Sequence, residues 1–367
     1  MSNIELRNVW KLYGSVEAVK DVSWDCSDGE FFSILGPSGC GKSSTLRMIA
    51  GLEEVSSGEI YFDGRCVNKL KPSKRNIAMV FENWALYPNL SVYENIAFPL
   101  RIRDVSEKEI DQKVREAIKF LDLENICYHN VKKLGSGEMQ RVSIGRAIVR
   151  DPVVMLMDEP ISHLDASLRG RMRDELKRKF NSVGMTTIYV THDQEEAMSM
   201  SDHILIMDNG CVQQIANPLD IYNNPSNEFV AGFIGEPPMN FIFCELVKEG
   251  NKYIIKSPTF TFDLDKASEK LFSTYRGIKK LKMGIRPEDV EVNLTEKPGS
   301  TAMEIDFVER KGDSTTIIMK LSEGELFFAQ LMQDLKLKIG QKIYVTFNQR
   351  KLHFFDIDSG YNILMSK

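Results

Sequence analysis

The sequence predicts an α/β domain built on a mostly parallel β-sheet, followed by an all-β domain. In the first part of the chain, short apolar runs alternate with helical stretches, which is typical of parallel strands that helices bury on both faces. After Pro238, strands with alternating apolar residues follow one another between glycine-containing turns, which is typical of a small β-barrel. We therefore expect one domain over residues 1–235 and a second over residues 236–367.

Short apolar runs that end at polar residues predict the strands of the first domain. They are FFSIL before a glycine-rich loop, VVMLM before an acidic pair, TTIYV before Thr-His, and HILIM before a turn and its hairpin partner CVQQI. The pairs Asp28-Gly29 and Asp63-Gly64 are typical of hairpin turns and predict an antiparallel β layer beside the parallel sheet. The middle of the domain has helical periodicity instead.

The second domain is predicted by a series of alternating runs with no convincing nucleophile or metal cluster among them. The runs are NKYIIKS, FTFDL, STTIIMKL, ELFFAQL, QKIYVTF and KLHFFDI. We therefore expect this domain to take no part in catalysis.

Length and charge restrict the classes of function. The 367 residues suit two domains, and the formal net charge of −5 gives no general attraction to nucleic acid, so we expect no nucleic-acid partner. No apolar run approaches the roughly 18 residues that span a bilayer. The N-terminal residues have no apolar signal-peptide core, so we expect a cytoplasmic protein that reaches a membrane through a partner. The six scattered cysteines, without a CxxC pair, are interpreted as reduced thiols.

A phosphate-binding loop is predicted where the pattern G-x-x-x-x-G-K-[ST] follows a strand and precedes a helix. Its glycines let backbone amides approach phosphate, Lys42 can neutralise the β- and γ-phosphates of ATP, and the Ser43 hydroxyl can bind Mg²⁺. The alternative is a glycine-rich turn without a ligand. The residues expected to bind nucleotide here are Gly36, Pro37, Ser38, Gly39, Cys40, Gly41, Lys42, Ser43 and Ser44.

Polar residues at the ends of two later strands complete the candidate catalytic set with Lys42. Asp158 and Glu159 follow VVMLM, where Asp158 would hold Mg²⁺ and Glu159 would polarise the attacking water. His192 follows TTIYV, at the end of a strand where open α/β sheets bind ligands, and would sense the γ-phosphate. The alternatives are a solvated acidic loop and a structural histidine.

With these motifs the chain resembles ABC-transporter ATPases, specifically those of maltose and glycerol-phosphate importers, over essentially its whole length. Further motifs of the resemblance are TIYVTHDQEEAM in the first domain and EPPMNFI, GIRPEDV and LHFFDIDSG in the second. The resemblance implies hydrolysis of Mg-ATP to power import. It also implies a helical subdomain at about residues 86–150 that contacts the membrane partner, and a regulatory second domain of small OB-like barrels.

The resemblance implies a set of partners as well. They are a second ATPase subunit, two transmembrane permease subunits and an external substrate-binding protein. Together they would place the chain peripherally at the cytoplasmic face of the cell membrane. The transported substrate would be a carbohydrate, polyol or glycerol derivative, selected by those partners.

Two more residues take an expected role from the resemblance. Tyr13, in KLYG, resembles the aromatic residue that stacks on adenine, and the alternative is a core tyrosine. Asp165, in SHLD, resembles the residue that reaches across the interface of the ATPase dimer. Its alternative is a cap of the following helix.

Two positions depart from the family's pattern. Glu82 stands where the family has a glutamine that contacts Mg²⁺ and the attacking water; a carboxylate still offers an oxygen to the metal but cannot donate a hydrogen bond. The signature, Leu-Ser-Gly-Gly-Gln in the family, is Leu134, Gly135, Ser136, Gly137 and Glu138 here. Gly135 lacks the hydroxyl that would donate to the partner's γ-phosphate, although Ser136 can substitute from one residue along.

These departures favour an asymmetric pair with a different ATPase subunit, because only one site of such a pair meets the altered signature. A homodimer with a tolerated variant signature is the alternative. Two other functions also stay open, namely a regulatory ATP-binding subunit with little turnover and a soluble ABC ATPase without a transporter. The intact Glu159 and His192 disfavour the first, and the importer-like second domain disfavours the second.

Overall fold

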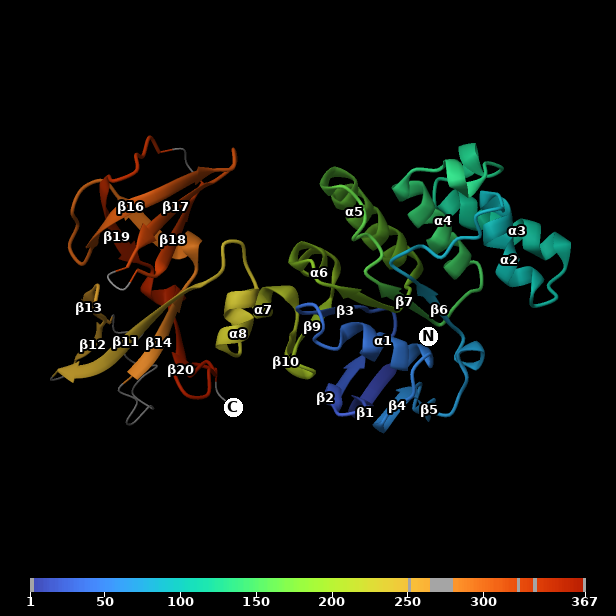
Figure 1. The fold of residues 1–367 in the computed structure, drawn as a ribbon, viewed down its shortest axis with the longest axis horizontal. Coiled ribbons are helices and arrows are strands. Elements are labelled where there is room, and N and C mark those ends of the chain that lie inside the picture. Colours follow the sequence, from blue (N-terminus) through green and yellow to red (C-terminus); the bar gives the residue numbers. More distant parts are fainter. Residues whose placement is uncertain (1–2, 250–251, 265–279, 322–323, 333–334, 366–367) are drawn as a thin grey trace. The chain divides into compact units, whose positions relative to one another are not determined.

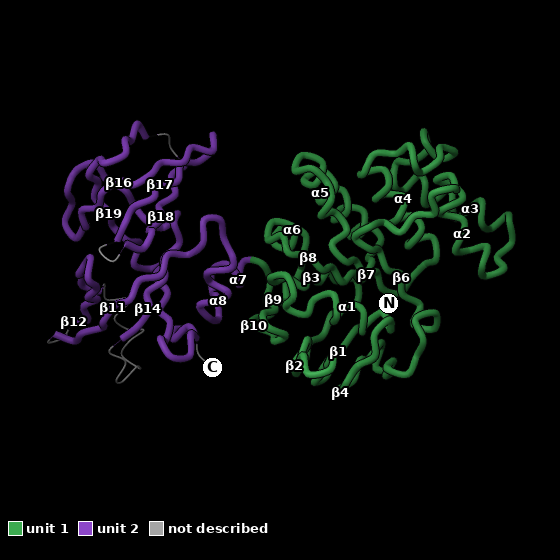
Figure 2. The backbone as a smooth tube through the Cα atoms, in the orientation of Figure 1, with its two compact units in different colours: residues 1–218 green, residues 219–367 purple. Residues whose placement is uncertain are grey.

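The computed structural model describes residues 3–249, 252–264, 280–321, 324–332 and 335–365, which form two compact units, residues 1–218 and 219–367 (Figure 2). The boundary between the two units, after Pro218, comes earlier in the chain than the domain boundary after residue 235 that the sequence predicts. Between the two positions lie α7 (Pro218–Asn223) and α8 (Glu228–Phe233). Ala231 of α8 packs with Met239 and Phe355, so α8 belongs to the second unit. The extent of the functional domains remains a prediction.

The larger sheet of the first unit has the strand order β10-β9-β3-β8-β7-β6 (Figure 1). All neighbouring strands pair in parallel except β9 and β10, which form a hairpin, so the predicted mostly parallel sheet is confirmed. Every residue of β3, β7 and β8 is buried, as expected for strands covered on both faces. The strands are β3 (Phe31–Leu35), β6 (Ile77–Val80), β7 (Val154–Asp158), β8 (Thr187–Thr191), β9 (His203–Asp208) and β10 (Cys211–Ala216).

The smaller sheet is the predicted antiparallel layer, with the order β2-β1-β4-β5. Its strands are β1 (Ile4–Tyr13), β2 (Val16–Cys26), β4 (Ser57–Phe62) and β5 (Arg65–Cys66). Asp63-Gly64 forms the hairpin turn between β4 and β5, but the hairpin predicted at Asp28-Gly29 is wrong. That pair connects β2 to β3, which belongs to the other sheet, because the fully buried β3 pairs with β8 and β9 rather than with β2.

The helices of the first unit pack in two different apolar cores. α1 (Lys42–Ala50) lies in a core that it shares with strands of both sheets, whereas α5 (Ala166–Val183) shares its core with α2 (Val92–Arg101), α3 (Glu107–Phe120) and α4 (Ser136–Ile148). Figure 1 shows α6 (Gln194–Met200) beside α5, on the side of the larger sheet opposite α1. α2, α3 and α4 are the predicted helical middle, and they pack closely, since a Cβ at Gly145 of α4 would lie 2.9 Å from Ile96 of α2. No helix of the described segments is long and apolar enough to cross a membrane.

The second unit contains two antiparallel sheets around one apolar core that includes Ile317 and Phe327. The first sheet has the order β13-β12-β11-β14-β20, and the second β15-β19-β16-β17-β18. The predicted all-β domain is therefore confirmed, although β11, β14, β15 and β16 were not among the predicted runs, and Asn251 of the NKYIIKS run lies outside the described residues. The strands are β11 (Asn240–Glu249), β12 (Lys252–Lys256), β13 (Thr261–Asp263), β14 (Lys280–Ile285), β15 (Val290–Asn293), β16 (Thr301–Arg310), β17 (Thr315–Lys320), β18 (Leu326–Leu331), β19 (Lys342–Phe347) and β20 (His353–Asp356).

Candidate active site

The loop at residues 36–43 joins β3 to α1, as its motif requires, and two of its glycines leave no room for a side chain. A Cβ at Gly36 would lie 2.2 Å from the carbonyl oxygen of Met207. Gly41 has a φ of +108°, and its Cβ would lie 2.4 Å from the carbonyl oxygen of Ala18. The backbone of the loop therefore fits tightly against neighbouring strands, which leaves its amides in a fixed arrangement at the start of α1.

Lys42 and Ser43 extend from the first turn of α1 to different partners. The ammonium of Lys42 donates to the carbonyl oxygens of Gly36 and Pro37, each at 2.8 Å, and the side chain is almost fully buried. The Ser43 hydroxyl donates to Oδ1 of Asp158 at 2.9 Å. The lysine charge and a hydroxyl–carboxylate pair are thus brought together at one end of the sheet.

Asp158 is a buried carboxylate whose charge is poorly compensated by the protein. Burial raises its pKa above the ordinary value, and the nearby carboxylate of Glu82 raises it further, against the hydrogen bond from Ser43 and the charges of Arg47 and Lys42. A bound divalent cation would offset this cost. The donor set also suits Mg²⁺, which prefers oxygen ligands such as a hydroxyl and a carboxylate.

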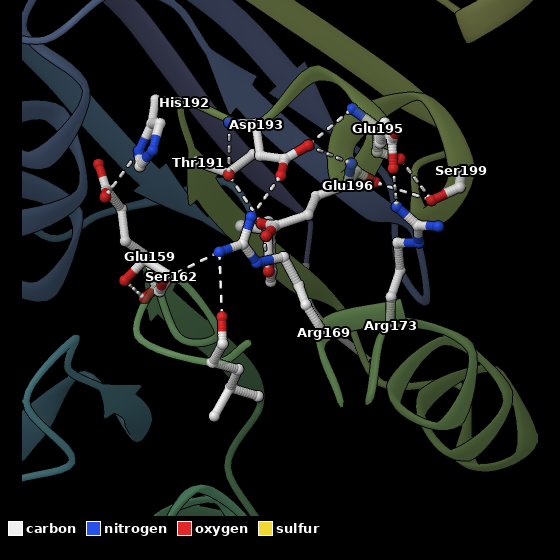
Figure 3. Close-up of polar contacts among 12 residues, drawn as sticks. Glu159, Ser162, Arg169, Arg173, Thr191, His192, Asp193, Glu195, Glu196 and Ser199 are labelled. Atoms are coloured by element: carbon white, nitrogen blue, oxygen red, sulfur yellow. Dashed lines mark hydrogen bonds and ion pairs between the residues drawn. The ribbon is translucent and has the colours of Figure 1, made fainter. Parts of the chain in front are cut away.

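Glu159 and His192 contact each other across the ends of β7 and β8. Nδ1 of His192 lies 2.8 Å from Oε2 of Glu159, and Figure 3 shows the imidazole directed at the carboxylate. Glu159 has a φ of 47°, a left-handed conformation that is strained for a residue with a side chain. The predicted base and the predicted phosphate sensor therefore form one unit rather than two independent groups.

A buried carboxylate supports the strand that ends before His192, and sequence reasoning missed it. Oε2 of Glu196 accepts hydrogen bonds from the hydroxyls of Tyr189, at 2.8 Å, and Thr191, at 2.7 Å. Burial raises the pKa of Glu196, and the two hydroxyl donors oppose that shift. The available signal was the position of Glu196 four residues before the buried Met200, on the same face of α6.

Tyr13 lies at the end of β1, and the residue is 42% exposed, so it is not a core tyrosine. Its hydroxyl is 3.5 Å from the Ser44 hydroxyl, beside the phosphate-binding loop. The ammonium of Lys11 lies 4.7 Å from the centre of the ring. An exposed aromatic face next to the loop is available for stacking on a base.

Glu82 lies in the loop that follows β6 and is half exposed. This loop has an unusual backbone, because Trp84 and Ala85 have φ values of 56° and 49°. Side chains of α4 hold it, since the Ser143 hydroxyl donates to the Trp84 carbonyl oxygen at 2.9 Å and Arg146 donates to it at 3.1 Å. The position of Glu82 therefore depends on α4 as well as on the large sheet.

The altered signature forms the start of α4. Gly135 is the N-cap residue, and its own backbone amide donates to Oε2 of Glu138 at 2.9 Å. Gly137 packs against α5, where a Cβ would lie 3.0 Å from Leu168. Asp165 caps α5 by accepting from the Leu168 amide at 3.0 Å, so the alternative given for Asp165 is present in the structure. Its role across a dimer interface remains a prediction.

The predicted residues form two groups in the structure. Contacts join the phosphate-binding loop to Tyr13 and Asp158, and join Glu159 to His192. Gly137 and Asp165 meet instead at Leu168, and no contact among the described residues joins them to the phosphate-binding loop. This division is consistent with one group that binds the chain's own nucleotide and another that faces elsewhere.

Three families match successive parts of the chain. Residues 19–162 match the family described as ABC transporter, residues 235–290 match the MalK OB fold domain, and residues 283–355 match the TOBE domain. The second and third matches agree with the all-β architecture of the second unit.

Curated relatives are similar to the chain over its whole length. It is 43% identical to the trehalose/maltose import ATP-binding protein MalK of Thermococcus litoralis, over 98% of this chain and 99% of that protein. It is 43% identical to the oligosaccharides import ATP-binding protein MsmX of Bacillus subtilis, over 99% and 100%. It is 42% identical to the sn-glycerol-3-phosphate import ATP-binding protein UgpC of Rhodopseudomonas palustris, over 98% of both chains.

Solved structures resemble the first part of the chain. One is the dimeric structure of a post-hydrolysis state of the ATP-binding cassette MJ0796, bound to ADP and inorganic phosphate. It is 31% identical, with a TM-score of 0.52, and the match covers 59% of this chain and 98% of that one.

Proposed function

This chain belongs to the family of ATP-binding subunits of ABC importers and is an ATPase of that type, and we propose that it hydrolyses Mg-ATP at the site above to drive the uptake of a carbohydrate, polyol or glycerol derivative. The substrate class follows from the relatives, which import trehalose and maltose, oligosaccharides or sn-glycerol 3-phosphate by their names. The permease subunits and an external binding protein would select the substrate.

The contact between Glu159 and His192 supports the catalytic proposal most directly. Their 2.8 Å separation places a carboxylate beside an imidazole at the ends of adjacent parallel strands. In the proposed mechanism Lys42 binds the β- and γ-phosphates, Glu159 orients a water for attack on the γ-phosphorus, and His192 contacts the γ-phosphate. Most of the rate enhancement would come from positioning and charge stabilisation.

Ser43 and Asp158 would hold Mg²⁺, with Glu82 from the neighbouring loop. The hydrogen bond between the first two and the raised pKa of Asp158 support this assignment. When bound, Mg²⁺ supplies positive charge that offsets the charge of the phosphates. Tyr13 would stack on the adenine ring, because its exposed face adjoins the phosphate-binding loop.

A groove on the helical side of the first unit supports docking of the permease subunits. Its volume is about 420 Å³, and the apolar side chains of Phe81, Tyr87 and Phe98 line it together with Arg103 and Arg146. Residues of α2, α4 and the loop after β6 therefore share one surface. A permease segment seated there would contact the same loop that contains Glu82, at the cytoplasmic face of the membrane.

We propose that the ATPase acts as an asymmetric dimer with a different ATPase subunit. In such a dimer Gly135, Ser136, Gly137, Glu138 and Asp165 would serve the partner's nucleotide. The dimeric structures similar to the first part of the chain support a dimer, and the hydrogen bond from the Gly135 amide to Glu138 supports a weakened signature. A regulatory subunit with little turnover is the second candidate, and Glu82 together with this signature favours it. A homodimer that tolerates the variant signature is the alternative to the asymmetric pair.

Measurement of ATP binding tests the first step of the proposed function. We expect Lys42→Ala to weaken ATP binding at least ~10-fold in calorimetry, because a charge that pairs with phosphate is lost. Lys20→Ala, which removes a partly exposed lysine paired with Glu17, is the matched control. Equal ATP affinity in the parent and the Lys42→Ala chain would contradict the proposed nucleotide-binding site. A separate experiment, the subunit composition of the purified transporter, identifies the other subunits.

A further inference from the structure

One guanidinium contacts two loops of the candidate active site. Arg169 lies in the first turn of α5, and its Nη2 donates to the carbonyl oxygens of Ser162, at 3.2 Å, and Leu164, at 3.1 Å. Its Nη1 donates to Oδ2 of Asp193 at 3.2 Å. Figure 3 shows the side chain between the segment that follows Glu159 and the segment that contains Asp193.

The second of these segments is fixed on its other side by α6. Oδ1 of Asp193 accepts from the backbone amides of Glu195, at 2.8 Å, and Glu196, at 3.2 Å. The amide of Asp193 donates to the Thr191 hydroxyl at 3.0 Å. The two carboxylate oxygens of Asp193 thus divide between α6 and Arg169, and His192 is the residue directly before this anchor.

The first segment is anchored at Ser162, three residues after the catalytic carboxylate of Glu159. The Ser162 hydroxyl donates to the carbonyl oxygen of Glu159 at 3.0 Å, while the Ser162 carbonyl oxygen accepts from Arg169. Glu159 has the strained φ of 47°, a conformation that persists only where surrounding contacts impose it. Arg169 supplies part of that constraint through Ser162.

We infer that Arg169 is a positioning residue that sets the contact between Glu159 and His192. Both loops that carry the pair are anchored to one planar group, whose donors point in two directions at once. An ammonium has no such fork, so lysine cannot reproduce the bridge. The inference rests on the proposed function, in which the pair orients water against the γ-phosphate, and it concerns the geometry of the pair rather than nucleotide binding.

Arg173 provides a matched control on the same helix. It lies one turn further along α5, also partly buried, and its Nη1 is 3.1 Å from Oε2 of Glu195 on α6. It has the same charge as Arg169 and also joins α5 to α6. Within the described part of the chain, its ion pair is with Glu195 and not with the loops that contain Glu159 and His192.

The test compares Arg169→Met, Arg169→Lys and Arg173→Met in the full-length chain by steady-state ATP hydrolysis, calorimetric ATP binding and thermal unfolding. We expect kcat to fall about 10- to 100-fold in Arg169→Met, since small misplacements of catalytic groups cost this much. ATP affinity should stay within about threefold, and Arg173→Met should stay within about twofold of the parental kcat. Arg169→Lys retains charge and most of the packing, so it should fold, and its kcat should still fall at least several-fold.

A double-mutant cycle of Arg169→Met and His192→Ala distinguishes a positioning role of Arg169 from a general loss of structure. If Arg169 acts through the pair, Arg169→Met should reduce kcat little further once His192 is removed. The inference would be overturned if the losses of kcat in Arg169→Met and His192→Ala were independent of each other. It would also be overturned by equal losses of kcat in the Arg169 and Arg173 variants, or by a parental kcat in Arg169→Lys. Parental turnover in His192→Ala would instead overturn the proposed role of the pair, and so the proposed function, while a normal Arg169→Met with an impaired His192→Ala would overturn the inference alone.

Discussion

Glu82 and His163 contact each other, with 3.4 Å between Oε1 of the carboxylate and Nε2 of the imidazole. The imidazole also meets the ring of Trp84 edge on, with 6.1 Å between ring centres and an interplanar angle of 73°. The residue that departs from the family's glutamine thus has a partner in the segment just before Asp165. Sequence reasoning gave His163 no role, because the contact joins segments far apart in the chain.

Glu82→Gln restores the amide of the family and removes a negative charge near Asp158. Because a carboxylate is the stronger ligand for a hard cation, we expect the Mg²⁺ concentration for half-maximal ATP hydrolysis to rise about two- to fivefold. A Mg²⁺ titration of hydrolysis measures this. Glu116→Gln, on the exposed side of α3, should leave the titration unchanged, and an unchanged midpoint in Glu82→Gln would exclude Glu82 as a ligand.

Glu159→Gln retains the shape of the side chain but cannot accept a proton from water. We expect hydrolysis to fall on the order of 10²-fold or more, while ATP still binds and a closed dimer accumulates. Phosphate release and gel filtration with ATP provide the two measurements. Parental hydrolysis in this variant would show that another group orients the water.

The signature can be returned to the family's pattern with Gly135→Ser, Ser136→Gly and Glu138→Gln. The serine adds a donor for the partner's γ-phosphate, and the glutamine removes a carboxylate that now accepts from the Gly135 amide. One missing donor can cost about 10²–10³ in rate, so we expect turnover at the partner's site to rise at least tenfold. A transporter that contains two identical copies of this chain, with equal turnover at both sites, would rule out the asymmetric pair.

Removal of the second unit should spare nucleotide binding. All the phosphate motifs lie in residues 1–218, so a chain that ends at Pro218 should bind ATP within about threefold of the parent. Ending at Gly235 is a poorer choice, since the Asn362 side chain donates to the Pro225 carbonyl oxygen at 2.9 Å and the Glu228 amide donates to Gly360 at 2.8 Å. A folded 1–218 chain that binds no ATP would contradict the prediction.

Acid should destabilise the second unit through His353. Burial, with the charges of Arg286 and Lys351, lowers the pKa of His353 from 6.5 to about 4. The unfolded chain therefore binds a proton that the folded unit does not, and the free energy of unfolding should fall as the pH drops from 6.5 towards 4. His353→Gln should reduce this slope in thermal unfolding between pH 4.5 and 7 (roughly the window set by the two pKa values); the same slope in parent and variant would assign it to other groups.

The sequence was most informative where function depends on neighbouring residues. The loop at residues 36–43 could be predicted because its glycines, lysine and serine are contiguous, and β3 and α1 bound it as the motif requires. Asp158, Glu159 and His192 could be placed because parallel strands end at one edge of a sheet. Arg169 and Glu196 could not, since their partners lie on other elements, and only the fold brings them together.

The wrong prediction at Asp28-Gly29 shows what a local turn signal cannot predict. The pair has the chemistry of a tight turn, yet the pairing of the next strand is decided by burial of FFSIL between β8 and β9 rather than by the turn itself. Local turn signals could therefore predict where the chain bends but not which strand it meets.

The loop with the unusual backbone at Trp84 and Ala85 connects the proposed metal ligand to the proposed docking surface. Glu82 lies in that loop. The α4 side chains that hold the loop, Ser143 and Arg146, also line the groove proposed for the permease, together with Tyr87. In the proposed assembly, substituting the ATPase of another importer would therefore change the docking surface and the metal ligand in one step.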